Sequence, residues 1–110
     1  MANKAATGVW LVDKSLTQAS GGAVSLVCAE NPSRGAVFIQ NTGSGGTAYI
    51  VFNAAGAAAP SSITAGSSGV IAITTGSFLN LGGSGWVPCN AIYTAGTSAD
   101  RLVCYETQNA

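Results

Sequence analysis

The segment that decides the fold reads NPSRGAVFIQNTGS and spans residues 31–44. Within it, a short apolar run from Ala36 to Gln40 lies between two stretches of Asn, Pro, Ser, Thr and Gly, the residues that favour turns. A run of this length fits a β-strand and is too short for a typical helix. The segment therefore predicts a strand between two tight connections.

The same pattern recurs along the 110-residue chain. We expect strands at eight places: Gly8 to Val12, Ala23 to Cys28, Ala36 to Gln40, Ala48 to Phe52, Val70 to Thr74, Phe78 to Leu81, Ala91 to Thr94 and Arg101 to Thr107. The connections are short, which favours antiparallel neighbours. The sequence thus predicts an all-β fold, an antiparallel β-sandwich that is jelly-roll-like or immunoglobulin-like, with about seven or eight strands.

One domain accounts for the whole length. We expect residues 1–15 to form an N-terminal arm with the first strand, and residues 16–110 to form the sandwich. Between two expected strands, residues 53–69 contain no charged residue, and Gly56 and Pro60 interrupt their Ala-rich part. The sequence predicts a long loop there, which is either functional or packed on a partner.

Charge is scarce in this sequence. Charged residues make up 7% of the chain, and four Lys and Arg balance four Asp and Glu. This gives no basic surface for nucleic acid or for an anionic membrane. There is no His, which removes the usual general base and any His-ligated metal site. We therefore expect a non-enzymatic protein with no catalytic, cofactor-binding or metal-binding residues.

The apolar stretches are also too short for a membrane helix, and the first residues lack the apolar core of a signal peptide. We expect a soluble protein that is made in the cytoplasm.

Three cysteines, Cys28, Cys89 and Cys104, are present without a CxxC spacing. We expect them to be reduced and to serve as small buried apolar side chains. The alternative is a disulfide between Cys89 and Cys104, which would leave Cys28 unpaired.

The carboxylates and the glycine-rich stretches also predict no catalytic or phosphate site. Four carboxylates, Asp13, Glu30, Asp100 and Glu106, fall beside different runs, so we expect solvated charges in turns and at strand edges and no shared acid/base site. Two glycine-rich strings, NTGSGGT at 41–47 and NLGGSGW at 80–86, lack the Lys-Ser/Thr ending of a phosphate loop. We expect both to be hairpin loops.

Aromatic residues offer one alternative to a purely structural role. The residues able to stack on sugars are Trp10, Tyr49, Trp86, Tyr93 and Tyr105. Trp86 is the best candidate, because it follows a glycine-rich stretch and precedes Val87-Pro88. The alternative is that such aromatics plug the end of the core or contact another subunit.

The strands expected at residues 48–52 and 101–107 are apolar on both faces. Ile50 and Phe52 alternate with Tyr49 and Val51, and Leu102 and Cys104 alternate with Val103 and Tyr105. A sheet with one wet face alternates apolar with polar residues instead. We take Tyr49, Val51, Val103 and Tyr105 as the outward set and expect a loop or a partner subunit to cover it.

A family resemblance rests on Arg34, the apolar run that follows and the turn Gln40-Asn41-Thr42-Gly43. It continues through residues 48–52, 91–95 and 102–106 and covers roughly residues 23–106. These features resemble small β-sandwich proteins encoded among the virion genes of tailed bacteriophages. The loop at 53–69 and the three cysteines depart from that pattern.

The resemblance implies a non-enzymatic structural virion protein, a decoration or cement protein that binds and stabilises a phage capsid. Its partners would be the major capsid protein or other virion proteins, and it would form a homo-oligomer without nucleic acid or membrane. It would be made in the host cytoplasm and reside in the virion. The alternative is a carbohydrate-binding or receptor-binding β-sandwich module of a virion or a cell surface.

Overall fold

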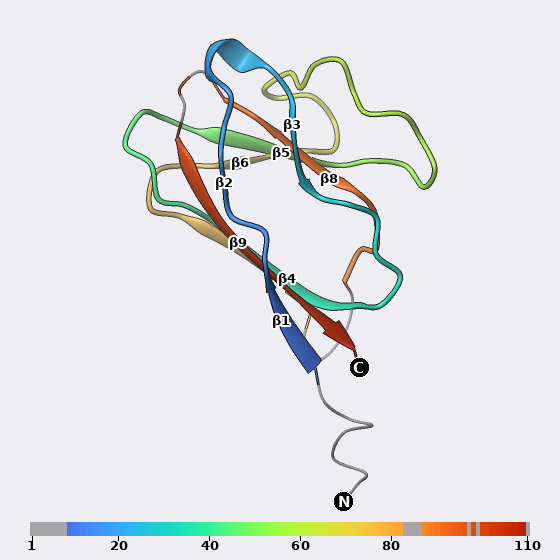
Figure 1. Ribbon diagram of the computed structural model, residues 1–110. Coiled ribbons are helices and arrows are strands. Elements are labelled where there is room, and N and C mark those ends of the chain that lie inside the picture. Colours follow the sequence, from blue (N-terminus) through green and yellow to red (C-terminus); the bar gives the residue numbers. More distant parts are fainter. Residues whose placement is uncertain (1–8, 83–86, 97, 99, 110) are drawn as a thin grey trace, which may run out of the picture.

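The computed structural model describes residues 9–82, 87–96, 98 and 100–109, and these form two antiparallel sheets packed face to face (Figure 1). The strands are β1 (Val9–Asp13), β2 (Leu16–Thr17), β3 (Ser25–Cys28), β4 (Arg34–Asn41), β5 (Ala48–Phe52), β6 (Val70–Ile73), β7 (Phe78–Gly82), β8 (Ile92–Ala95) and β9 (Arg101–Asn109). A single 3-10 turn at Ser20–Gly22 separates β2 from β3. None of the described segments is a helix long and apolar enough to cross a membrane.

The strand order is that of a jelly roll. The five-stranded sheet runs β1-β9-β4-β7, with β2 also paired to β9, and the four-stranded sheet runs β3-β8-β5-β6. In the described chain, β5 and β6 are the sole consecutive strands that pair with each other. The strands β1 and β2 both pair with β9 in one sheet, and the other connections pass from one sheet to the other. The predicted all-β sandwich is confirmed, and of its two variants the structure has the jelly roll.

All eight expected strands are present with ends shifted by a few residues, although Gly8 lies outside the described residues. The sequence missed β2, because a two-residue strand has no alternating pattern of its own.

The expectation of hairpin loops was wrong for the string at 41–47. That segment joins β4 to β5, which lie in different sheets. The segment before β9, which holds Asp100, likewise comes from the opposite sheet. Short connections are compatible with this arrangement because packed sheets lie only about 10 Å apart. Part of the second string, residues 83–86, lies outside the described residues.

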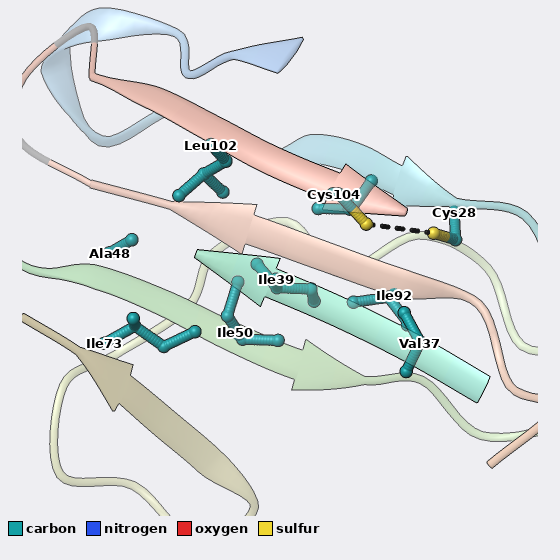
Figure 2. Packing of buried hydrophobic residues seen from close by; sticks show 10 residues of the cluster. Cys28, Val37, Ile39, Ala48, Ile50, Ile73, Ile92, Leu102 and Cys104 are labelled. Carbon is teal, nitrogen blue, oxygen red and sulfur yellow. Dashed lines mark hydrogen bonds between the residues drawn. The ribbon is translucent and has the colours of Figure 1, made fainter. Parts of the chain in front are cut away.

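The core lies between the two sheets (Figure 2). Alternate residues of β4, β5 and β9 point into it, as a period of two requires, whereas β3 contributes the consecutive residues Val27 and Cys28, where its register shifts. Its buried members are Val27, Cys28, Val37, Ile39, Ala48, Ile50, Ile73, Ile92, Leu102 and Cys104. The outward set expected from the sequence is confirmed, since Tyr49, Val51, Val103 and Tyr105 are half-buried on the outer faces.

Candidate functional site

The outer face of the five-stranded sheet carries a group of apolar side chains that are partly exposed to solvent, together with the polar residues Gln40 and Asn80. Register places Tyr105 beside Phe38 and Val103 beside Gln40, and Gln40 lies opposite Phe78 on β7. The rings of Phe38 and Phe78 are 5.5 Å apart between centroids. Phe78 is 61% exposed and Leu11, on the outer face of β1, is 68% exposed. We call Leu11, Phe38, Phe78, Val103 and Tyr105 the open apolar face.

Charge on the open apolar face is confined to its border. Among the described residues, the register brings only Asp13, on β1, and Arg101, at the start of β9, to this side of the sheet. The amide N–H of Ser15 donates to Asp13 Oδ1 over 2.9 Å and holds the pKa of this carboxyl below its usual value. An apolar centre with few charges fits a protein partner better than a polyanion.

The outer face of the four-stranded sheet is apolar too, but the chain covers part of it. Leu26, Tyr93, Val51 and Val70 form one row across its four strands. In the next row, Ala95 is only 3% exposed, although it points outward. Here the loop at 53–69 lies over the sheet. A pocket of about 270 Å³ remains between them, lined by Gly22, Tyr49, Ile63, Ala65, Ala95 and Gly96. The loop at 53–69 thus supplies part of the cover expected from the sequence.

The consecutive strands β6 and β7 each form an edge of a sheet, and neither strand is charged. The strand β6, with the sequence VIAI, is an edge of the four-stranded sheet, and β7, with the sequence FLNLG, is an edge of the five-stranded sheet. Neither strand carries a charged residue or a proline, the usual protections against pairing with another chain. The edge of β7 adjoins the open apolar face, and the edge of β6 belongs to the other sheet.

Arg34 and Glu106 form a buried ion pair. Arg34 Nε donates to Glu106 Oε2 over 2.7 Å, and the guanidinium also donates to the carbonyl oxygens of Pro88, Asn90 and Ala29 over 2.6, 3.0 and 3.0 Å. Lys14 Nζ approaches Glu106 Oε1 at 4.0 Å. The expectation that Glu106 is a solvated charge was therefore wrong. The pair ties the strands to the loops and leaves no free group for chemistry.

Asp100 also departs from the expected solvated role. It is buried, and its Oδ1 accepts a hydrogen bond from the Gly45 amide over 2.9 Å. Asp13 and Glu30 are exposed, as the sequence predicted. Within the described chain, no three His, Cys, Asp or Glu side chains gather closely enough to hold a metal ion. The carboxylates act on local structure and not at one common site.

The aromatic residues proposed as a sugar platform do not share one surface. Tyr49 and Tyr93 lie on the outer face of the four-stranded sheet, whereas Tyr105 lies on that of the five-stranded sheet. Trp10, on β1, is 67% exposed. Trp86, the leading candidate, lies outside the described residues. The described aromatic residues thus contribute to separate surfaces.

The cysteines divide into a buried pair and a single thiol. Cys28 and Cys104 are buried with their sulfur atoms 3.7 Å apart, and all three cysteines are free. Cys89 is half-buried and lies 3.8 Å from the carbonyl oxygen of Pro32. Burial as small apolar side chains is thus confirmed for Cys28 and Cys104 and wrong for Cys89. The partner of Cys104 is Cys28 and not Cys89, the alternative considered from the sequence.

Comparisons with known proteins give a likeness of fold. No family model matches the chain. No curated protein matches it either. Among solved structures, a chain of the Bacillus endospore appendages, which are described as a novel family of disulfide-linked pili, is similar with a TM-score of 0.53. The identity is 16%, and the match covers 92% of this chain and 85% of that one. At this identity the likeness concerns the fold.

Proposed function

We propose that this chain is a non-enzymatic structural protein of a phage virion, which binds the capsid as a decoration or cement protein and stabilises it. The observation that carries the proposal is the open apolar face of the five-stranded sheet. Phe78 and Leu11 remain mostly exposed there in the isolated chain. Exposed apolar side chains gathered on one face are typical of a surface that binds another protein.

The surroundings of the face suit a permanent contact. A stable interface buries upwards of about 1,000 Å² in total, with an apolar centre and a polar rim. The five-stranded sheet offers such a centre, with Asp13 and Arg101 at its border. The uncharged edge strand β7 adjoins it and can extend the contact through backbone hydrogen bonds. The partners in this proposal are the major capsid protein or other virion proteins, together with further copies of the chain.

The internal polar groups support a structural role in place of a catalytic one. Arg34 donates a hydrogen bond to Glu106, and its other hydrogen bonds go to loop carbonyls. Asp100 holds the loop at Gly45. Catalysis needs an acid, base or nucleophile that can reach a substrate. These groups stabilise the sandwich and its loops.

A second candidate is a subunit of a self-assembling fibre, and the fold likeness to a pilus chain favours it. That likeness spans 92% of this chain. In a fibre, the uncharged edges of β6 and β7 would contact the next copy rather than a capsid.

Sedimentation with phage heads tests both candidates. Heads assembled without this chain are mixed with the purified chain and pelleted, and the chain alone is spun in parallel and viewed by negative-stain electron microscopy. The capsid role predicts that the chain pellets only when heads are present, at a saturable ratio. Fibres that pellet without heads would support the second candidate instead. A chain that stays in the supernatant in both tubes contradicts both, and binding of that soluble chain to a glycan array would favour a carbohydrate-binding module.

A further inference from the structure

Cys28 and Cys104 bring two thiols together across the core. Cys28 ends β3 in the four-stranded sheet, and Cys104 lies within β9 in the five-stranded sheet. Their sulfur atoms point toward each other at 3.7 Å, and the two residues are 76 positions apart in the chain (Figure 2). The two thiols thus face each other between the two layers of the sandwich, and both are free.

The surroundings keep the pair isolated from other reactive groups. Ile39 lies opposite Cys104 in the sheet, and Ile92 lies opposite Cys28. The third thiol, Cys89, contacts the Pro32 carbonyl. Each sulfur of the pair therefore has one thiol within reach.

We propose that Cys28 and Cys104 are an oxidation site at which a small-molecule disulfide, such as oxidised glutathione, closes a disulfide bond between the two sheets. One cysteine thiolate attacks the small disulfide, releasing one thiol and leaving a mixed disulfide on the protein. The second cysteine thiolate then attacks the protein sulfur of that mixed disulfide and releases the second thiol. Two electrons pass from the protein to the small disulfide, and the two cysteine protons leave on the two released thiols.

Cys28 is the thiol that the reagent reaches first. Both sulfurs are buried in the closed sandwich, so exchange needs a local opening. The strand β3 has four residues, forms an edge of its sheet and pairs with β8 alone, and its register shifts between Leu26 and Cys28. By contrast, β9 is held by β1, β2 and β4. The hydrogen bond with Cys28 and burial both raise the pKa of the Cys104 thiol, so Cys104 is the poorer nucleophile until β3 opens.

The disulfide bond between Cys28 and Cys104 would stabilise the protein by restricting its unfolded state. A cross-link that closes a long loop removes conformational freedom from the unfolded chain, so the oxidised protein resists unfolding more strongly. A protein made in a reducing cytosol would close this bond after release into oxidising surroundings. The closure would stabilise the subunit after it has folded.

Tryptic mapping tests the proposal on the full chain, since cleavage after Lys14, Arg34 and Arg101 places each cysteine on its own peptide. Those peptides are 15–34, 35–101 and 102–110. The folded protein is incubated with oxidised glutathione at mildly alkaline pH, trapped by alkylation, unfolded and digested without reductant. The expected product joins peptide 15–34 to peptide 102–110. Closure of the bond removes the mass of two hydrogen atoms from the intact chain. Cys89 should be found alkylated or glutathionylated.

Matched variants separate the pair from Cys89. In a Cys89→Ser background the linkage should persist, and the thermal midpoint of the oxidised form should exceed that of the reduced form by on the order of 10 °C. Adding Cys104→Ser should abolish both the linkage and the rise. The proposal is overturned if the wild-type chain yields only glutathione adducts or free thiols, if peptide 35–101 is the linked partner, or if oxidation leaves the midpoint of the Cys89→Ser protein unchanged.

Discussion

Arg34 Nε lies 2.7 Å from Glu106 Oε2 in the interior of the protein, and the two side chains close one end of the sandwich. The same guanidinium also bonds to the carbonyls of Ala29 before β4 and of Pro88 and Asn90 before β8. One side chain therefore holds two strands of the five-stranded sheet and two loops together. Removing one member of such a buried pair leaves an uncompensated charge.

Arg34→Ala should destabilise the fold strongly. The substitution leaves the buried Glu106 carboxylate with Lys14 Nζ, 4.0 Å from Oε1, as its remaining counter-charge, and it removes the donor from three carbonyls. We expect a loss of about 3 to 5 kcal/mol in the free energy of unfolding, measured by urea denaturation. Arg101→Ala, at an exposed position, is the control and should change it by less than about 0.5 kcal/mol. Equal stability of the two variants would contradict the anchoring role of Arg34.

The sequence contained a signal for the burial of Glu106, but not for its partner. Leu102, Cys104 and Glu106 follow a period of two, so the face that buries the first two also buries the third. The register of β4 against β9 shifts between Arg34 and Ala36, and this irregularity turns Arg34 toward the same interior as Val37. A bulge of this kind depends on pairing with a distant strand, which local pattern cannot reveal.

Gly43→Ala should destabilise the connection between β4 and β5. A Cβ atom on Gly43 would overlap the Asp100 side chain, and the Asp100 carboxylate would have to leave its bond to the Gly45 amide. We expect a loss of about 1 to 3 kcal/mol in unfolding free energy. Ser44→Ala, the exposed neighbour, should melt like the wild type in the same thermal scans. A Gly43→Ala protein that melts with it would show that the loop accommodates the methyl group freely.

The strands could be predicted, but their order could not. Residues 36–40 and 101–107 were located as short apolar runs between turn residues, a pattern that is local in the sequence. Pairing of β9 with both β1 and β4 is a non-local choice, so the sequence left jelly-roll and immunoglobulin-like orders open. The cover over Ala95 was likewise undetermined, since nothing local to the loop at 53–69 says which face it lies on.

Stability should depend on the charge of Asp13 at acid pH. The Ser15 amide lowers the folded-state pKa of Asp13 below the value of about 3.9 that the unfolded chain has. The carboxylate therefore contributes stability above the unfolded pKa, and the contribution is lost as the pH falls through the lower folded pKa. Asp13→Asn keeps an acceptor oxygen but removes the charge. In thermal melts, the midpoint of the wild type should exceed that of Asp13→Asn at about pH 6, and the two midpoints should converge near about pH 2. A constant difference across that range would rule out the charge as its cause.

A charge placed on the open apolar face should abolish assembly without unfolding the chain. Phe78 is 61% exposed on β7, and Leu26 is 50% exposed on the outer face of the opposite sheet, so each tolerates Asp in the isolated protein. Because an unpaired charge buried at an interface costs several kcal/mol, Phe78→Asp should weaken head binding by at least about 100-fold. Leu26→Asp should bind heads like the wild type, and both variants should melt within a few degrees of it.

The pair of variants also locates the contact if the assignment is wrong. Loss of binding in Leu26→Asp together with normal binding in Phe78→Asp would move the interface to the four-stranded sheet, where the row of Leu26, Tyr93, Val51 and Val70 is the other apolar surface. Val103→Glu then serves as a second probe of the first face, since Val103 lies beside Gln40 on the neighbouring strand and Gln40 lies opposite Phe78. If all three variants fold and bind heads normally, neither outer face is the contact, and apolar residues on both sides of a strand do not by themselves indicate an interface in this protein.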